Sequence, residues 1–160
     1  MPRVVLFEPQ IPPNTGNVAR SCAATGTPLH LIEPLGFSLA DRQLKRAGLD
    51  YWPLVDLHRH ADWEAFQGEV RASGGRLIAL SSHAESSYTA FAFADNDWLL
   101  FGRETDGLPQ AQLRASDHRL VIPMRHARRL QQPGVRSLNL SVSVAVVLFE
   151  ALRQLDQLTP

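Results

Sequence analysis

Short apolar runs alternate with amphipathic segments along most of the chain. The runs predict buried strands, and they lie at residues 4–7, 29–32, 76–80, 98–101 and 120–122. Segments with helical spacing predict helices at residues 17–25, 39–47, 62–72 and 109–115. Alternating helices and nearly all-apolar strands are typical of a parallel sheet covered on both faces. We therefore predict an α/β fold in which residues 1–160 form one domain.

The ends of three predicted helices carry recognisable signals. Gly26 follows the first helix, and Gly74 with Gly75 follows the helix that Asp62 can cap. Pro109 stands where the first turn of a helix tolerates proline, because no backbone N–H is needed there.

Residues 133–155 join a polar loop to the longest apolar stretch of the chain. From Val142 to Phe149 there is no charged residue, and Ser143 is the one polar residue. The β-branched valines would also suit a buried strand, but the spacing of the leucines that follow favours a helix of four to five turns, capped by Asn139 or Ser141. A helix that is apolar nearly all round must be covered on more than one side. We expect the second cover to be another subunit, which makes a homodimer; the alternative is a core helix inside a monomer.

Composition narrows the setting of the protein. The 160 residues are 44% hydrophobic and 20% charged, as in ordinary globular domains. The single cysteine, Cys22, excludes a disulfide framework and a cysteine-rich zinc site, and we interpret it as a small core residue. The N-terminus reaches an acidic residue too soon for a signal peptide, and no apolar run approaches the ~20 residues of a membrane span. We expect a cytoplasmic protein without a membrane partner.

The formal net charge is zero, but the basic residues are not evenly spread. No acidic residue occurs between positions 119 and 136, which hold His126 and five arginines: Arg119, Arg125, Arg128, Arg129 and Arg136. Guanidinium groups in a loop bind phosphates bidentately, so this patch favours a nucleic-acid partner. The alternative is a solvated loop in a chain whose basic residues are nearly all arginine.

Three loops at predicted strand ends carry polar groups. They comprise residues 8–20 with Gly16, residues 101–108 with Gly102 and Gly107, and residues 122–139. Ligands of open parallel sheets bind beyond the carboxyl ends of the strands, so we expect the site there.

Several common sites are absent from the sequence. No Gly-x-Gly-x-x-Gly follows the first strand and no P-loop is present, which argues against a dinucleotide enzyme, a common Rossmann-type methyltransferase and a P-loop enzyme. His58-Arg-His60-Ala-Asp62 is similar to the opening of a hydrolase metal site, but Trp63 follows instead of a further histidine. We interpret it as a loop with a helix cap and predict no metal.

The three loops together resemble the ordered motifs of the SPOUT-class RNA ribose methyltransferases. The motifs are Asn-Thr-Gly-Asn-Val-Ala-Arg at 14–20, Phe-Gly-Arg-Glu-Thr-Asp-Gly-Leu at 101–108 and Arg-Ser-Leu-Asn-Leu-Ser at 136–141. The segments 6–13 and 46–51 are similar to those of the TrmL type, the minimal single-domain enzymes that act on the tRNA wobble position. The resemblance covers nearly the whole chain.

This resemblance implies a C-terminal trefoil knot, a dimer, and methyl transfer from S-adenosyl-L-methionine to the 2′-hydroxyl of the first anticodon nucleotide, cytidine or uridine 34. It assigns donor binding to Leu80, Gly102, Ile122 and Ser137, and it places Arg20, Glu104 and Asn139 near the transfer. We assign RNA binding to Asn14, Arg125, Arg128, Arg129 and Arg136.

The chemistry constrains these roles. A ribose hydroxyl is a very weak acid, so its proton must be removed or shared while the methyl group is placed in line, and no metal is needed. Arg20 is a poor base at neutral pH, and we expect it to position a phosphate and stabilise oxyanion character. Glu104 has a catalytic or a loop-organising role, and Ser137 and Asn139 bind the ligand or cap the helix. The need for a 2′-hydroxyl selects RNA over DNA.

Two departures from the resemblance concern the substrate and the dimer. Phe149 stands where relatives commonly have tyrosine, and the loop between Met124 and Arg136 is longer than in compact members. The alternatives are a methyltransferase of another RNA, either ribosomal RNA or another tRNA position, and a non-catalytic RNA-binding protein. The three motifs favour the enzyme, and the lack of an added RNA-binding domain favours tRNA.

Overall fold

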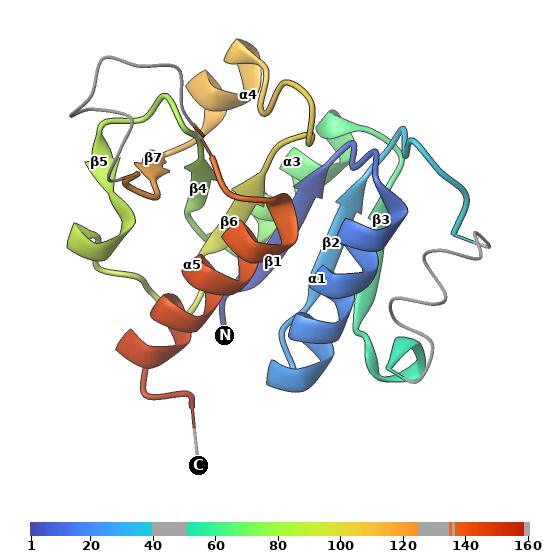
Figure 1. The fold of residues 1–160 in the computed structure, drawn as a ribbon, viewed down its shortest axis with the longest axis horizontal. Helices are drawn as coiled ribbons and strands as arrows, with labels where there is room; N and C mark the ends of the chain where they lie inside the picture. The colour runs from blue at the N-terminus through green and yellow to red at the C-terminus, as the bar shows by residue number, and fades with distance from the viewer. Residues whose placement is uncertain (40–50, 125–134, 136, 159–160) are drawn as a thin grey trace.

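The described part of the chain is built on one parallel sheet (Figure 1). The structure is a computed structural model, and it describes residues 1–39, 51–124, 135 and 137–158. Seven strands occur in these residues, in the order β3-β2-β1-β6-β4-β7-β5, and every pair is parallel. Their bounds are Arg3–Phe7 for β1, Leu29–Ile32 for β2, Leu57–His60 for β3, Leu77–Leu80 for β4, Ser86–Ser87 for β5, Trp98–Phe101 for β6 and His118–Val121 for β7.

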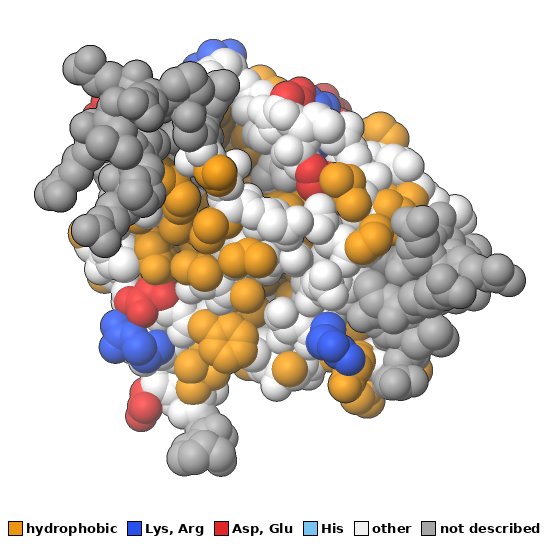
Figure 2. Space-filling view, in the orientation of Figure 1, with side chains coloured by type: hydrophobic (Ala, Val, Ile, Leu, Met, Phe, Trp, Pro, Cys, Tyr) orange, Lys and Arg blue, Asp and Glu red, His pale blue; other side chains and the backbone are white. Residues whose placement is uncertain are grey.

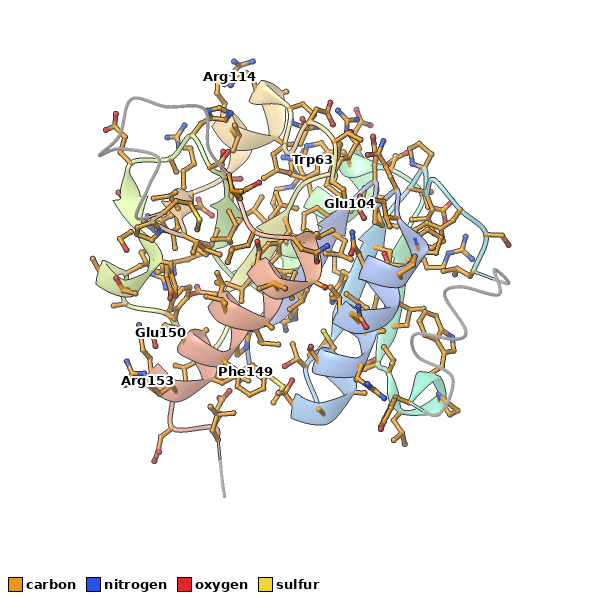
Figure 3. The ribbon with its side chains drawn as sticks, viewed as in Figure 1. Trp63, Glu104, Arg114, Phe149, Glu150 and Arg153 are labelled. Carbon is orange, nitrogen blue, oxygen red and sulfur yellow. The ribbon has the colours of Figure 1, made fainter. Side chains whose placement is uncertain are left out.

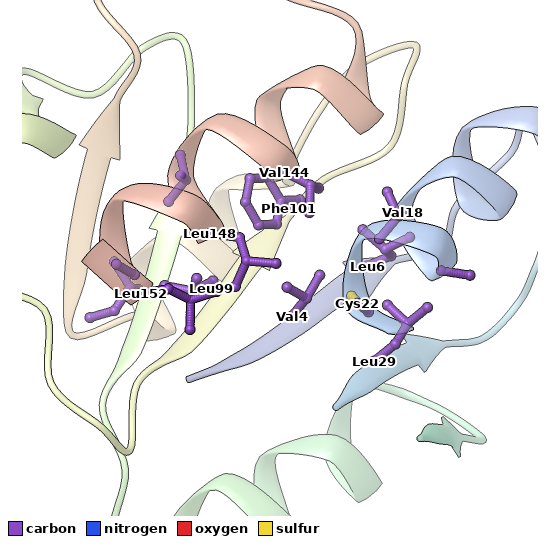
Figure 4. Close-up of a cluster of buried hydrophobic side chains, with 14 of the residues drawn as sticks. Val4, Leu6, Val18, Cys22, Leu29, Leu99, Phe101, Val144, Leu148 and Leu152 are labelled. Atoms are coloured by element: carbon purple, nitrogen blue, oxygen red, sulfur yellow. The ribbon is translucent and has the colours of Figure 1, made fainter. Parts of the chain in front are cut away.

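Helices cover both faces of this sheet. The described helices are α1 at Pro12–Thr25, α3 at Trp63–Ser73, α4 at Gln110–Ala115 and α5 at Leu140–Gln154, with short 3-10 helices η1 at Trp52–Leu54 and η2 at Tyr88–Ala90. Helices α1 and α5 contact each other and share one apolar cluster with the strands (Figure 4). Side chains of α3 and α4 belong to a second cluster on the other face. The predicted α/β fold with a doubly covered parallel sheet is confirmed.

Alternate residues of each central strand enter the two clusters. In β1, Val4 and Leu6 pack with α1 and α5, whereas Val5 and Phe7 pack with α3 and α4. All four are at most 3% exposed. Burial on both sides explains why the strands occur in the sequence as apolar runs without polar alternation.

Most predicted elements have the bounds that the pattern gave. Strands β2 and β6 match residue for residue, and β1, β4 and β7 differ by one or two residues at their ends. Helix α3 has the predicted cap, since the Asp62 carboxylate accepts a hydrogen bond from the Ala65 backbone N–H at 2.8 Å. Gly26 and Gly74 end their helices at φ values of 66° and 64°, in the left-handed region that glycine adopts without strain. Helix α5 begins after Asn139, one of the two predicted caps.

Helix α1 begins earlier than predicted. It starts at Pro12 rather than at Asn17, because prolines fit the first helical turn, where backbone N–H groups have no intrahelical partner. Asn14 and Gly16 are therefore helical and buried, and the loop that precedes them is short.

The interpretation of residues 58–62 as a loop with a helix cap was wrong for its first half. His58 and His60 belong to β3, an edge strand that pairs with β2. This strand carries two histidines and an arginine, as edge strands often carry charged side chains, so it does not resemble a buried apolar run. Strand β5, which has two residues, was also missed.

Two predictions fall on residues outside the described ones. The helix predicted at residues 39–47 lies almost wholly within residues 40–50, and the C-terminal part predicted to form a trefoil knot contains residues 125–134; the structure describes neither range. Both stay predictions. None of the described helices has the length and apolar character needed to cross a membrane.

A histidine cluster joins β2 to β3. His30 is 1% exposed, its Nδ1 lies 2.9 Å from Nε2 of His60, and its ring stacks on that of His58 at 4.4 Å between centroids. Burial lowers the pKa of His30 from 6.5 to about 3, and the neighbouring His58, His60 and Arg3 add to this effect. His30 is therefore neutral when folded at neutral pH.

This cluster predicts a loss of stability in acid. Because the unfolded chain binds a proton at His30 near pH 6.5 and the folded chain does so only near pH 3, stability is complete above about pH 6.5 and falls towards about pH 3. Urea unfolding at about pH 7.5 and about pH 5.5 should differ by about 1 kcal/mol from this group.

Two variants separate His30 from other titrating groups. His30→Leu should remove most of the difference between the two pH values, and His83→Leu, at an exposed histidine, should retain it. An equal pH difference in His30→Leu and the unsubstituted protein would show that His30 does not cause it.

Candidate functional site

A pocket of about 790 Å³ lies beyond the carboxyl ends of β6, β4 and β7, with the start of α1 beside it. It is lined by the segments 101–108, 80–83 and 137–140 together with Ile11, Asn14, Ile122, Met124 and Ser143. This is the edge at which open parallel sheets bind their ligands, as the sequence predicted.

Seven of the predicted site residues line this pocket. They are the four assigned to donor binding, Leu80, Gly102, Ile122 and Ser137, together with Asn14, Glu104 and Asn139. Ser81, Ser82 and His83, which follow β4 directly, also line the pocket and were not predicted from the sequence. Their position after a strand end was the available signal.

Arg20 lies elsewhere on the molecule. It is exposed, does not line the pocket, and its guanidinium carbon is 4.5 Å from the centre of the Tyr51 ring. Arg125, Arg128, Arg129 and Arg136, predicted to bind RNA, lie outside the described residues.

The Glu104 carboxylate holds the start of α1. Its oxygens accept hydrogen bonds from the backbone N–H groups of Gln10 at 2.8 Å and Ile11 at 3.0 Å. Helix α1 has no side-chain cap of its own at Ile11, and the first amides of a helix attract negative charge. Glu104 therefore supplies this cap from a loop more than ninety residues away in sequence. Figure 3 shows Glu104 near the N-terminal ends of α1 and α5.

Two asparagines extend this contact to α5. The Asn14 side-chain amide donates to Glu104 at 3.3 Å, and the Asn139 amide donates to the Asn14 oxygen at 2.9 Å. The Asn139 oxygen in turn accepts from the backbone N–H of Ser141 at 2.9 Å and from its hydroxyl at 2.8 Å. Because a carboxylate only accepts hydrogen bonds, Glu104 fixes the direction of both amides. We call Glu104, Asn14 and Asn139 the motif triad.

Residues 102–108, which carry Glu104 and which we call the glycine loop, are closed by backbone contacts. Arg103 and Gly107 exchange two backbone hydrogen bonds, at 3.2 Å and 3.0 Å. A Cβ atom at Gly102 would lie 2.2 Å from the Gly107 carbonyl carbon and 2.3 Å from the Leu108 nitrogen, so only glycine fits there. Gly107 itself has a φ of 74°, which glycine adopts without strain.

Charged side chains pair around the same loop. The Arg103 guanidinium donates to Asp106 at 2.7 Å through two nitrogens and to Glu8 at 2.7 Å. The hydrogen bonds that Arg103 donates to Asp106, and then to Glu8, raise the pKa of Arg103, and Arg103 lowers the pKa of the Asp106 carboxyl. Among the described residues, no arginine, lysine or histidine forms an ion pair with Glu104. Within this part of the chain, the Glu104 charge is therefore balanced by the dipoles of the amides that donate to it.

A group of possible metal ligands occurs away from the pocket, and it shares only His60 with the residues 58–62 that the sequence singled out. His30, His60 and Glu69 bring ligand atoms within 4.8 Å of one another at the β2–β3 edge, and none of them lines the pocket. Cys22 is buried as predicted, and burial raises its pKa to about 12, so its thiol is unreactive. The prediction that no metal takes part stays a prediction.

Comparison with known proteins adds to this geometry. A tRNA (cytidine(34)-2′-O)-methyltransferase of Polaromonas sp. is 51% identical over 152 residues, which is 94% of this chain and 89% of the relative. A solved structure described as "Structural insights into the 2-OH methylation of C/U34 on tRNA" has a TM-score of 0.89 and 49% identity, and the match covers 98% of this chain and 97% of that one.

A more distant solved structure has AdoMet bound. An AdoMet-bound rRNA methyltransferase from Sinorhizobium meliloti has a TM-score of 0.83 at 26% identity, with 96% of this chain and 56% of that chain covered.

The sequence pattern of the family described as SpoU rRNA Methylase matches residues 1–149. That span contains the motif triad, the glycine loop and all seven strands of the described sheet. The chain therefore belongs to the SpoU rRNA methylase family.

Proposed function

We propose that this protein transfers a methyl group from S-adenosyl-L-methionine to the ribose 2′-hydroxyl of nucleotide 34, the wobble cytidine or uridine of tRNA. The observation that carries the proposal is the motif triad, which brings three segments distant in sequence to one pocket. The relatives named for this reaction match nearly the whole chain, and they support the wobble position as the target.

The residues of the pocket fit the methyl donor. Leu80 and Ile122 offer apolar surface, Ser137 offers a hydroxyl, and Gly102 lets the backbone of its loop fold tightly on itself. A largely preformed cleft with a few polar groups is typical of cofactor sites. We assign donor binding to Leu80, Gly102, Ile122 and Ser137. When bound, the donor supplies a methyl group on a positively charged sulfur.

The reaction needs placement more than strong acid–base groups. Transfer would form a bond between the ribose oxygen and the methyl carbon, break the carbon–sulfur bond with release of S-adenosylhomocysteine, and pass the hydroxyl proton to water. Glu104 and Asn139 are engaged within the motif triad, so we assign them positioning roles rather than proton transfer. We assign Arg20 to the RNA, where its fixed charge binds a backbone phosphate outside the pocket. This scheme uses no metal.

A second copy of the chain completes the assembly in this proposal. Val142 and Phe149 are 46% and 44% exposed on α5, two turns apart on one side of the helix. Apolar side chains gather over α5 on the face seen in Figure 2. Large apolar side chains exposed together indicate an interface. A homodimer in the cytoplasm and the trefoil knot of SPOUT enzymes are parts of the same proposal.

The reaction is tested with a labelled methyl donor and unmodified RNA. Label should enter tRNA at position 34, and a tRNA with a 2′-deoxynucleotide at that position should accept none. A panel of ribosomal RNA transcripts tests the related activity that the family description suggests. Label in ribosomal RNA alone, or in the deoxy-substituted tRNA, would contradict the proposal.

The donor site is tested by adding one methyl group. Gly102→Ala should weaken the affinity for S-adenosylhomocysteine, measured by calorimetry, at least about tenfold, because the new Cβ cannot fit beside Gly107. Gly68→Ala is the matched control, since nothing lies within 4 Å of its Cβ position on α3. The control should keep the affinity and gain up to about 1 kcal/mol in stability. Equal affinity in both variants would place the donor elsewhere.

The dimer is tested by placing a charged residue on the exposed face of α5. Sedimentation should give twice the mass of the 17.8 kDa chain for the unsubstituted protein and the mass of one chain for Phe149→Glu. Arg114→Glu, on α4 at the top of Figure 3 and well away from Phe149 near the bottom, should remain dimeric. A monomeric unsubstituted protein, or a dimeric Phe149→Glu, would contradict this interface.

A further inference from the structure

Arg20 and Tyr51 form a pair on the surface of the molecule. The Arg20 guanidinium carbon is 4.5 Å from the centre of the Tyr51 ring, within the range of a cation–π contact. Arg20 is exposed and Tyr51 is 36% exposed. Among the described residues, no carboxylate forms an ion pair with Arg20. Within the described part of the chain, the contact with Tyr51 is therefore the interaction that restricts this long side chain.

Such a contact restricts an arginine without occupying its hydrogen-bond donors. A guanidinium group that lies against a ring by its face keeps its N–H groups at its edges, where phosphates and hydroxyl oxygens bind. An ion pair would instead occupy these donors and neutralise the charge. The ring thus lowers the conformational freedom that Arg20 would lose on binding RNA.

Tyr51 is itself well anchored. It is the N-cap residue of η1, and the Leu54 backbone N–H donates to its carbonyl oxygen at 2.8 Å. Trp52, the next residue, packs against the apolar cluster beneath α1, and η1 contacts α1. The backbone of Tyr51 is therefore fixed relative to the helix that carries Arg20.

We propose that Tyr51 is a positioning residue, which holds the Arg20 guanidinium in the orientation that binds the RNA backbone beside the methylated ribose. This inference rests on the proposed function and deepens it. It gives a role to the last residue of segment 46–51, whose resemblance to tRNA wobble methyltransferases assigned it none.

The test is a double-mutant cycle between the two positions. Tyr51→Leu should lower kcat and the affinity for an anticodon stem-loop about fivefold, the size expected for loss of an exposed cation–π contact. Tyr51→Phe keeps the ring and should behave as the unsubstituted protein. In an Arg20→Ala background, Tyr51→Leu should cause no further loss, because it acts through the arginine. The affinity for S-adenosylhomocysteine should not change in any of these variants.

The outcomes separate this inference from the proposed function. The positioning role would be overturned if Tyr51→Leu lowered kcat and stem-loop affinity by the same factor with and without Arg20→Ala. It would also be overturned if Tyr51→Phe caused the same losses as Tyr51→Leu. Absence of methyl transfer by the unsubstituted protein would overturn the proposed function, while coupling measured by stem-loop binding would still support Tyr51. Circular dichroism checks the fold of each variant, and Tyr51→Met replaces Tyr51→Leu if the latter is unfolded.

Discussion

A single carboxylate at the beginning of a helix determines how the pocket is assembled. Glu104 accepts hydrogen bonds from two backbone N–H groups at the start of α1. Through hydrogen bonds with Asn14 and Asn139 it also fixes the start of α5. Each of these contacts joins residues at least ninety positions apart. Because the carboxylate can only accept hydrogen bonds and lies where amides need an acceptor, it sets the direction of each hydrogen bond in this series. Loops that would otherwise be independent thereby present their residues to one cavity.

The sheet makes this arrangement possible by fixing where the loops begin. Strands β1 and β6 are adjacent and buried on both faces, so their carboxyl ends, from which residues 8–11 and 102–108 leave, are held side by side. The glycine loop adds a second constraint, because Gly102 leaves no room for a side chain against Gly107 and Leu108. Rigid strand ends with tightly closed loops give the preorganisation that methyl transfer requires.

The sequence predicted the central strands of the sheet better than its edge strands. Central strands such as β2 and β6 are buried on both faces, and their apolar runs are distinctive. Strand β3 carries histidines and an arginine at the sheet edge, and its pairing with β2 depends on residues distant in sequence. Seven site residues were found through their motifs and strand-end positions, whereas the hydrogen bonds between Glu104, Asn14 and Asn139 were not foreseeable. No local pattern records which distant side chain caps α1. No local pattern records either that Arg20 lies outside the pocket.

The account therefore depends on Glu104 as an acceptor for three donors. The most direct measurement is the affinity of Glu104→Gln for S-adenosylhomocysteine, compared by calorimetry with that of the unsubstituted protein. Glutamine has nearly the same shape but replaces one acceptor oxygen with an N–H donor that faces other donors. The account predicts that the affinity falls about tenfold or more, since a hydrogen bond to a charged group is worth about 1.5–3 kcal/mol, while circular dichroism shows a retained fold. An unchanged affinity would contradict it, because the three segments would then converge without this carboxylate.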